Sequence, residues 1–540
     1  MSGIGKGVIA ASIGKIMQVR GLRVTAVKID PYLNYDAGTM NPYIHGEVFV
    51  TEDGGETDMD IGTYERFLDV NIPKSHNITT GQVYSSVIER ERRGDFLGKC
   101  VQIIPHITDE IKERLLRIAQ EEQVDLVLVE IGGTVGDIES LPYLEAAREL
   151  RLEEGSKNVV NVHVTLVPVL DVVGEQKTKP TQHSVQELRR IGVQPDIIVA
   201  RSKAPLNSGP RKKIALFCNV EESGVFTSQD IESVYQSPLL LDQQGLGVYL
   251  EGRLGFPAKT PAWGSWEKMV YSHLNAQEQV NIAVCGKYAE LADCYVSVNE
   301  ALKDAGAAAN AKVNLEWIET DDFEEDPEKV RVLSRFDGVL VPGGFGVRGG
   351  EGKIHAIEYA RKHDVPFLGI CFGFQLAVVE FARSIGINSA GSAELDSTSD
   401  NPVIDLMPEQ GSVLEKGGTM RLGAHGITVD VGTVAQKLYG KNSILERHRH
   451  RYEVNPKFIG QMVSSGLKFS GKSDANRRME ILELPNKKFH FATQFHAEFK
   501  SRPGRPSPPY FGLVKAALAS KTPPKGSEQI ITQSSRRKRG

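Results

Sequence analysis

The sequence predicts an α/β protein with two large domains, each built around a mainly parallel sheet. Its 540 residues predict about three to five units, or two large ones, since a domain usually contains about 100–200 residues. Short apolar runs of strand length alternate with segments of helical periodicity, which is typical of a parallel sheet covered by helices. Both patterns weaken at residues 252–279, where Pro, Gly and Trp gather, and this segment is predicted to connect the two domains.

The first half predicts one long helix and four strands. Residues 8–19 place apolar side chains at helical spacing, and Gly21 is a suitable helix terminator. Because parallel sheets are buried on both faces, their strands form continuous apolar runs. The runs of this kind are residues 24–29, 124–131, 159–170 and 196–200.

The second half predicts a further series of strands and helices. Residues 280–285 are predicted as a strand, residues 295–306 as a helix, and residues 338–341 and 365–370 as two more strands. The polar segment after Ala519 is predicted to be disordered. Its RRKR run is compatible with a targeting or modification site, although a solvated tail is favoured. The predicted units are residues 1–252, 253–278, 279–519 and 520–540.

Composition and charge narrow the functional classes. The formal net charge is −5, whereas nucleic-acid binders usually need a basic surface to neutralise phosphates. No apolar run approaches the roughly 20 residues that span a bilayer, and the first residues do not resemble a signal peptide. The 5 cysteines form no CxxC pair, which argues against a zinc site or a disulfide framework. A cytoplasmic protein without membrane or nucleic-acid partners is therefore expected.

The segment GICFGFQLAVVEFARSIG carries the strongest chemical signal. It places Cys371 between Gly369 and Gly373, where a buried strand meets a helix. This G-x-C-x-G pattern is the cysteine form of the nucleophile elbow, whose glycines permit a sharp turn that presents the side chain above the sheet. The N-terminus of the following helix would stabilise the thiolate. A buried structural cysteine is the alternative, but two glycines at the required positions favour a nucleophile.

A nucleophilic cysteine needs a base and a group that orients the base. ATQFHAEFKSRP supplies His496 and Glu498, which would share one face of an extended segment. PGGFG at residues 342–346 supplies backbone amides suited to an oxyanion hole. In this chain order, the elbow, PGGFG and H-x-E resemble class I glutamine amidotransferases. That family implies that Cys371 attacks the glutamine amide, that His496 acts as base and acid, and that ammonia is released. It usually has H-P-E, whereas this chain has Ala497 in the middle.

SGIGKGVIAAS is similar to a compressed phosphate loop. Its glycines let backbone amides approach phosphates, and Lys6 is predicted at a helix N-terminus, where anions are favoured. The pattern departs from G-x-x-x-x-G-K-[ST] and is weak alone. Lys28 and Glu130 are predicted at strand ends, and Asp58 and Asp60 lie in an acidic segment. Acidic groups beside a phosphate loop would repel ATP unless a cation joined them, so a Mg²⁺ site is favoured over a solvated acidic loop.

The segment GEQKTKPTQHSVQELR places two lysines and several polar groups before a predicted helix. Such a cluster would suit a second triphosphate. A basic loop without a ligand is an equal alternative when the segment is taken alone.

Together these motifs resemble the CTP synthase family. GGTMRLG and SRPGRPSPPYFGL are similar to its eukaryotic branch. The resemblance implies an α/β chain with an N-terminal P-loop-type parallel-sheet synthetase domain and a C-terminal class I glutamine amidotransferase domain of flavodoxin-like fold. The landmarks cover roughly residues 2–515 and are SGIGKG, KIDPYLNYDAGTMNPYIHGEVFVTEDGGETDMD, EIGGTVGDIES, GEQKTKPTQHSV, KIALFCNV, VPGGFGVRG, GICFGFQ, ERHRHRYEVNP and TQFHAEF.

The resemblance also implies the reaction, which belongs to de novo pyrimidine nucleotide synthesis. ATP would phosphorylate UTP at its 4-oxygen, and ammonia would displace the phosphate to give CTP. Lys6 and Lys28 would stabilise the transferring phosphoryl group, and Asp60 and Glu130 would hold Mg²⁺. The other residues that the resemblance places at ATP are Gly3, Ile4, Gly5, Gly7, Val8, Gln229, Asp230 and Ile231.

Further sites follow from the same resemblance. GTP, an allosteric activator, would be sensed at Arg348, and CTP would act as a feedback inhibitor. Ammonia would pass through a tunnel between the halves of a homotetramer, and several family members assemble further into filaments. UTP and CTP would be bound by Ser2, Asp137, Ile138, Glu139, Lys177, Thr178, Lys179, Gln182 and Lys213. Glutamine would be bound by Gly344, Phe372, Gln375, Glu394 and Arg451.

The N-terminus departs from the family pattern. Family members have a strand and a Gly-Gly turn immediately before SGIGKG, whereas Met1 and Ser2 stand there in this sequence. Loss of a central parallel strand would cost several kcal/mol of burial and would remove amides from the phosphate cradle. The sequence therefore predicts either a misassigned start or an impaired synthetase half. A catalytically weak filament or scaffold protein on this fold is one alternative function. A second alternative is another ligase with the same glutaminase module. It is disfavoured because the segment GEQKTKPTQ matches other amidotransferases poorly.

Overall fold

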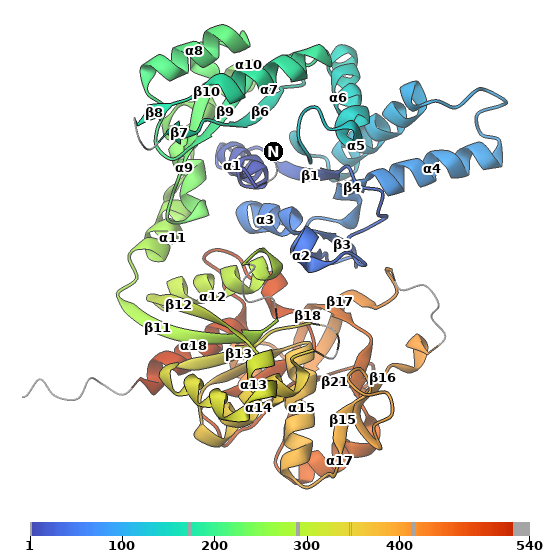
Figure 1. Cartoon of the computed structure of the whole chain (residues 1–540), viewed down its shortest axis with the longest axis vertical. Helices are drawn as coiled ribbons and strands as arrows, with labels where there is room; N and C mark the ends of the chain where they lie inside the picture. Colours follow the sequence, from blue (N-terminus) through green and yellow to red (C-terminus); the bar gives the residue numbers. More distant parts are fainter. Residues whose placement is uncertain are drawn as a thin grey trace, which may run out of the picture.

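The computed structural model describes residues 3–170, 174–287, 292–344, 346, 348–411 and 417–521. Two α/β halves lie one above the other along the long axis of the molecule (Figure 1). In the sequence they are joined through α11 (Gly264–Leu274). Ser2 and most of the predicted tail, from residue 522 onwards, lie outside the described residues.

The first half contains two parallel sheets of three strands. In one sheet, β1 (Val24–Asp30) lies between β4 (Asn77–Thr79) and β5 (Leu126–Ile131). All side chains of β1 are buried, as its apolar run predicts for a strand covered on both faces. The other sheet has the order β10 (Val225–Gln229), β9 (Ile197–Ser202) and β6 (Val162–Leu166).

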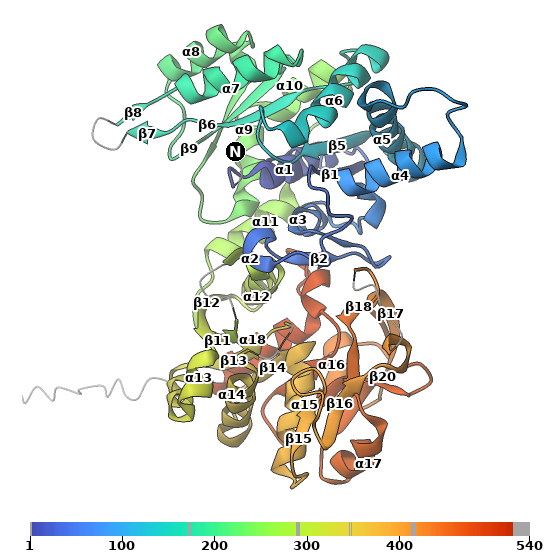
Figure 2. The same ribbon diagram turned by 45° about the vertical axis from the view of Figure 1, so that its right-hand side comes forward.

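Helices enclose these sheets and form the core of the first half. The central helix α1 (Lys6–Gln18) packs against α3 (Met59–Leu68) and α9 (Ser237–Gln243). Below them, α2 (Pro42–His45) and the hairpin of β2 (Val48–Val50) and β3 (Glu56–Asp58) face the second half (Figures 1 and 2). The remaining helices are α4 (Thr80–Arg93), α5 (Thr108–Glu122), α6 (Leu141–Glu154), α7 (Lys179–Arg190), α8 (Ser208–Cys218) and α10 (Leu246–Leu254).

The second half is built on one sheet of nine strands, five parallel and then four antiparallel. The parallel part has the order β12 (Ala311–Glu319), β11 (Glu278–Gly286), β13 (Gly338–Val341), β14 (Phe367–Ile370) and β22 (His490–Thr493). The antiparallel part continues with β21 (Arg478–Glu483), β20 (Lys468–Ser473), β17 (Arg421–Val429) and β18 (Ser443–His450).

Helices pack on both faces of this sheet and make a three-layer arrangement. One hydrophobic core joins it to α12 (Val296–Ala308) and α18 (Pro508–Ser520). A second core, on the other face, contains α14 (Gly350–His363) and α15 (Phe372–Ser384). The functional residues described below lie at the carboxyl ends of the central parallel strands, where ligands bind in open α/β sheets.

Most strands lie where the apolar runs predict them, but residues 159–170 are not one strand. They contain β6 and the separate strand β7 (Val169–Leu170), which pairs with β8 (Glu175–Gln176). Pro168 lies immediately before β7 and has no amide hydrogen to donate to the β6 ladder. Among the described residues, no helix is both long enough and apolar enough to cross a membrane.

β5 and β6 are each an edge strand of one of the two three-stranded sheets of the first half. In the part of the chain that the structure describes, β5 pairs only with β1, and β6 pairs only with β9. The side chain of Val129 on β5 is 38% exposed although the strand is apolar. Each edge therefore has backbone groups available for one more parallel strand.

Candidate active sites

Cys371 lies at the turn between β14 and α15, as the sequence predicts. Its φ of 51° is left-handed, which is a strained conformation for a residue with a side chain. A Cβ added at Gly373 would lie 2.1 Å from the carbonyl oxygen of Val341, and one at Gly369 would lie 2.8 Å from that of Gly373. Both flanking positions therefore require glycine, which explains the G-x-C-x-G pattern physically.

His496 and Glu498 follow the neighbouring strand β22. The Nδ1 atom of His496 lies 2.7 Å from Oε1 of Glu498, and the Tyr510 hydroxyl donates to the other carboxylate oxygen at 3.3 Å. The prediction of an extended segment is wrong, because Glu498 lies in a single 3-10 turn, η9 (Ala497–Lys500). Since the turn starts directly after His496, it folds the carboxylate back towards the ring.

Gly343 of the PGGFG segment lies between the thiol and the imidazole. A Cβ added there would be 2.7 Å from Cε1 of His496 and 3.6 Å from Cβ of Cys371. The three residues meet because β13, β14 and β22 are consecutive in the sheet, and each residue follows one of these strands. A glycine at this point lets backbone amides approach a reacting carbonyl, as an oxyanion hole requires.

The charges around His496 favour its protonated form. Burial lowers the pKa of His496, but the Glu498 carboxylate and Cys371 outweigh burial and raise that pKa to about 10. A buried imidazolium beside a cysteine can supply a proton donor next to a thiolate nucleophile. The arrangement can therefore perform acyl transfer through a thioester.

The residues predicted to bind glutamine lie around this point. Phe372 and Gly344 are the chain neighbours of Cys371 and Gly343. The amide of Gln375 on α15 donates to the carbonyl of Tyr452 at 3.1 Å. Burial raises the pKa of Glu394, whose carboxylate accepts from the amide of Gly346 at 3.1 Å.

Two predicted arginines lie on loops near the same end of the sheet. Arg451 follows β18 and donates to the hydroxyl of Thr419 at 3.0 Å. Arg348, the residue predicted to sense GTP, pairs with Asp321 at 2.7 Å, and its side chain is 55% exposed. Arg348 therefore has a guanidinium that solvent and a ligand can reach.

In the first half, the ammonium group of Lys28 lies among four carboxylates. Its Nζ contacts Asp60 and lies 3.2 Å from Glu130, 3.7 Å from Asp58 and 3.9 Å from Asp30. Burial raises the pKa of Asp58 to about 7 and that of Asp30 to about 6, although Lys28 acts in the opposite direction. One lysine does not balance four carboxylates, so the cluster favours a further cation.

The glycine-rich turn lies against this cluster. Helix α1 begins at Lys6, directly after Gly5, which has a φ of 84°. A Cβ added at Gly7 would lie 2.0 Å from Oδ1 of Asp60. The Nζ of Lys6 donates to the carbonyl of Gly133, beyond the end of β5, at 3.3 Å. The predicted phosphate loop and the predicted acidic residues are therefore adjacent.

The donor set at this point fits Mg²⁺. Asp60 and Glu130 supply carboxylate oxygens, the ligands that Mg²⁺ prefers. Both carboxylates contact the ammonium group of Lys28. Asp60 also borders the start of α1, so an ion held by these two carboxylates would be near phosphates bound at the phosphate loop. The site accordingly suits metal-assisted phosphoryl transfer.

The predicted UTP residues gather at the start of α7. Gln182 donates to the hydroxyl of Thr178 at 3.0 Å, and Lys177 pairs with Glu175 at 2.6 Å. Lys177 and then Lys213 lower the pKa of Glu175, so Lys213 on α8 lies near the same loop. Lys179 is the first residue of α7.

Two other predicted segments border these elements. Residues 137–139 enter the turn η3 (Ile138–Ser140), and a Cβ at the preceding Gly136 would lie 3.5 Å from Cγ of Glu187 on α7. Residues 229–231 begin with the last residue of β10, and Asp230 pairs with Arg201 at 2.6 Å.

A buried His–His–Glu cluster lies elsewhere in the second half. Among the described residues, the one group of three or more His, Cys, Asp or Glu side chains whose ligand atoms all lie within 4.8 Å of one another consists of His448, His450 and Glu480. The guanidinium of Arg421 lies 3.3 Å from each imidazole and 2.8 Å from the carboxylate. An arginine therefore already fills the cation position, and we assign no metal there.

Sequence patterns do not predict Tyr64, Asp30 or Gln494 as site residues. The Tyr64 hydroxyl donates to Glu130, and Nε2 of Gln494 lies 3.8 Å from Sγ of Cys371. Asp30 and Gln494 stand inside the KIDPY and TQFHAEF motifs, so their positions carried a usable signal. Tyr64 is one helical turn beyond Asp60, and only the three-dimensional contact reveals it.

The fold and the two sites define a glutamine amidotransferase joined to a nucleotide-using synthetase. Two family models match: "CTP synthase N-terminus" over residues 1–256 and "Glutamine amidotransferase class-I" over residues 290–516. CTP synthase from Pyrococcus abyssi is 59% identical over 519 residues, which are 96% of each chain. CTP synthase from Methanopyrus kandleri is 56% identical over 520 residues, 96% of this chain and 97% of its own. The chain belongs to the CTP synthase family.

A solved structure of part of a relative also matches. The Trypanosoma brucei CTPS glutaminase domain with bound acivicin is 34% identical and covers 45% of this chain and 95% of its own, with a TM-score of 0.43. The likeness to the eukaryotic branch stays a prediction.

Proposed function

We propose that this chain catalyses the ATP-dependent amination of UTP to CTP with ammonia released from glutamine. The observation that carries the proposal is the match to CTP synthases along 96% of the chain, together with a Cys–His–Glu arrangement in one half and a Lys–carboxylate cluster beside a phosphate loop in the other. No observation favours the scaffold alternative.

In the glutaminase half, the thiolate of Cys371 attacks the amide carbon of glutamine. His496 gives its proton to the leaving nitrogen, which departs as ammonia and leaves a glutamyl thioester. Amides near Gly343 stabilise the oxyanion, and Glu498 holds the imidazole by its Nδ1 atom. His496 then takes a proton from water, whose attack on the thioester carbon breaks the C–S bond, releases glutamate and restores the thiolate and the imidazolium.

In the synthetase half, Lys6 and Lys28 donate to the phosphoryl group that passes from ATP to the 4-oxygen of UTP. Mg²⁺ held by Asp60 and Glu130 would offset the charge of the phosphates. Lys177 and Lys179 at the start of α7, together with Lys213, bind the UTP triphosphate through their ammonium groups. Ammonia then displaces the phosphate from the UTP ring.

Regulation and assembly follow the family pattern in this proposal. GTP activates through Arg348, CTP inhibits through residues 137–139, and the chain acts as a cytoplasmic homotetramer that can extend to filaments. All cysteines are free thiols, which suits a reducing compartment. The synthetase, linker, glutaminase and tail units are assigned to residues 1–252, 253–278, 279–519 and 520–540.

The experiment that tests this function is a CTP formation assay with ATP, UTP and Mg²⁺, run with glutamine and then with ammonium. Both nitrogen sources are expected to support CTP formation. Absence of CTP with either source would contradict the proposal.

Replacing Glu498 with glutamine is expected to lower the upper pH limit of glutamine hydrolysis. The folded-state pKa of His496 is raised to about 10, so the imidazolium persists until the pH rises through that value. Removing the carboxylate charge should lower this pKa by about 1–3 units, and the alkaline limb of glutamate release should move down with it. An unchanged limb would show that Glu498 does not hold the proton on His496.

A further inference from the structure

Helix α3 has one face in the phosphate site and another at the interface between the halves. Asp60 and Tyr64 are four residues apart and share one face, where they contact Lys28 and Glu130. Glu65 is the next residue, about 100° further round the helix, and its side chain points to the second half. One rigid helix therefore carries contacts of both kinds.

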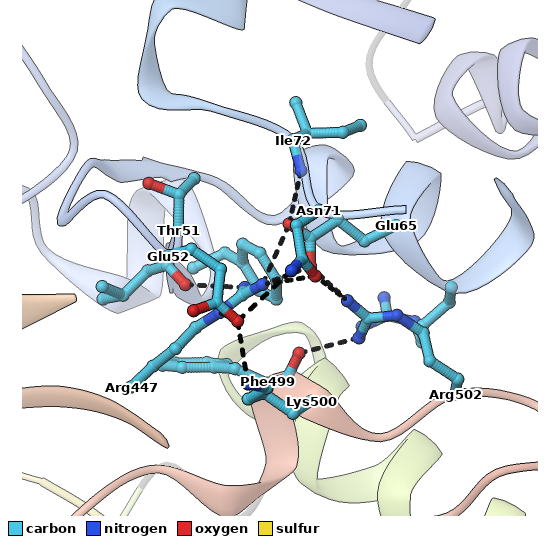
Figure 3. A network of polar contacts seen from close by, with 12 residues as sticks. Thr51, Glu52, Glu65, Asn71, Ile72, Arg447, Phe499, Lys500 and Arg502 are labelled. Atoms are coloured by element: carbon cyan, nitrogen blue, oxygen red, sulfur yellow. Dashed lines mark hydrogen bonds and ion pairs between the residues drawn. The ribbon is translucent and has the colours of Figure 1, made fainter. Parts of the chain in front are cut away.

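Glu65 is fully buried and accepts hydrogen bonds from two arginines of the second half (Figure 3). Nη2 of Arg447 lies 2.9 Å from Oε2 of Glu65, and Nη2 of Arg502 lies 2.6 Å from the same oxygen. The other carboxylate oxygen accepts from the amide of Ile72 at 2.9 Å. Asn71 accepts from both arginines as well, at 3.2 and 3.3 Å. Together these charge-assisted hydrogen bonds hold the Glu65 carboxylate and both guanidinium groups in one arrangement.

Both arginines support the backbone that carries His496. The carbonyl of Arg447 accepts from the amide of His496 at 2.8 Å. Nη1 of Arg502 donates to the carbonyl of Phe499 at 2.9 Å. The ring of Phe499 stacks on the imidazole of His496 with 5.0 Å between centroids and 14° between planes. Glu65 is thus connected to the catalytic imidazole by two separate routes.

A second set of contacts across the interface leads to Cys371. Arg449 is two residues from Arg447 on β18 and points to the same side, where its Nε donates to Glu56 at 2.7 Å. The carbonyl of Arg449 accepts from the thiol of Cys371 at 3.6 Å. Glu56 begins β3, and Asp58 at the end of β3 caps α3 and borders Lys28.

We propose that Glu65 is a positioning residue for the glutaminase and that α3 transmits occupancy of the phosphate site to His496. A nucleotide that moves Asp60 and Tyr64 moves Glu65 with them, because all three are fixed to one helix. The arginines then carry the displacement to the segment that holds the imidazole. The inference rests on the proposed function and adds to it the residues that couple the two sites.

The test is Glu65→Gln, which keeps the shape of the side chain and removes its charge. Glutamate release should fall in kcat by about 10-fold or more, with the KM for glutamine within about twofold, because the glutamine pocket lies on α15 and its neighbouring loops. CTP formation from ammonium should stay within about twofold of the unchanged protein. ATP with UTP should change the rate of glutamate release in the unchanged protein and should not change it in the variant.

Glu52→Gln is the matched control, because Glu52 contacts Arg447 at 3.6 Å and Lys500 at 2.9 Å from the rim of the same interface. Glu52→Gln should leave the rates of glutamate release and of CTP formation from ammonium within about twofold of the unchanged protein.

If Glu65→Gln does not fold, Asn71→Ala is the second variant. It removes a hydrogen-bond acceptor of the same arginines without removing a charge. It should lower kcat for glutamate release by about threefold while ammonium-dependent synthesis is retained. Unchanged glutamate release, or equal loss of both reactions, would overturn the inference. Absence of CTP from the unchanged protein would instead contradict the proposed function, since glutamate release measures this inference by itself.

Discussion

Replacing Cys371 with alanine is expected to abolish CTP formation from glutamine while CTP formation from ammonium continues. The thiol is the nucleophile that the geometry supports, and alanine cannot form the thioester, so glutamate release should fall by at least about 10³-fold. The Lys28 cluster lies in the other half of the molecule. The measurement compares CTP formation with the two nitrogen sources in the same preparation.

Cys285→Ala is the matched control for this experiment. Cys285 is a buried thiol on β11 of the same half, and burial raises its pKa to about 12. It should therefore be inert, and its loss should leave both reactions nearly unchanged. Loss of ammonium-dependent synthesis in the folded Cys371 variant would contradict the assignment of two separate sites.

Replacing either Asp60 or Glu130 with alanine is expected to remove CTP formation from both nitrogen sources. These carboxylates border the phosphate loop, and a triphosphate is repelled by the remaining acidic groups unless a cation is held there. We expect a loss of at least about 10²-fold in kcat, because the metal also offsets charge in the transition state of phosphoryl transfer.

Asp125→Ala controls for loss of a carboxylate in the same sheet. Asp125 immediately precedes β5 and pairs with Arg23 at the end of the sheet away from the site. This variant should retain nearly full synthesis. Near-normal rates in the Asp60 or Glu130 variant with Mg²⁺ present would refute the metal assignment.

The nucleophile elbow could be predicted from sequence because its causes are local. Backbone atoms within a few residues or on the adjacent strand leave no room for a Cβ at Gly369 or Gly373. Glycine is therefore needed at two fixed positions relative to Cys371, and a sequence pattern can detect this. The strand positions were predictable for a similar reason, since burial on both faces leaves continuous apolar runs. Pro168 divides one predicted run into two strands, and its missing amide hydrogen could have indicated this division.

Long-range contacts were not predictable in the same way. The motifs suggest that Lys28, Glu130 and the acidic segment with Asp58 and Asp60 belong to one phosphate site, and the resemblance to a family then assigns Mg²⁺ to Asp60 and Glu130. The sequence does not show that Asp30 also borders the ammonium group of Lys28. The contact between Glu65 and Arg447 spans the two halves, and no spacing or periodicity connects these positions. Such pairs depend on how finished elements pack together, which a single sequence does not encode at any fixed offset.

The central claim is that nitrogen passes from the Cys371 site to UTP within one protein. It is tested most directly by supplying glutamine with an isotopically labelled amide nitrogen, together with ATP, UTP, Mg²⁺ and unlabelled ammonium, and measuring label in the 4-amino group of CTP. The account predicts labelled CTP from the unchanged protein and only unlabelled CTP from the Cys371→Ala variant. CTP without label from the unchanged protein would contradict the account, because the two sites would then act independently.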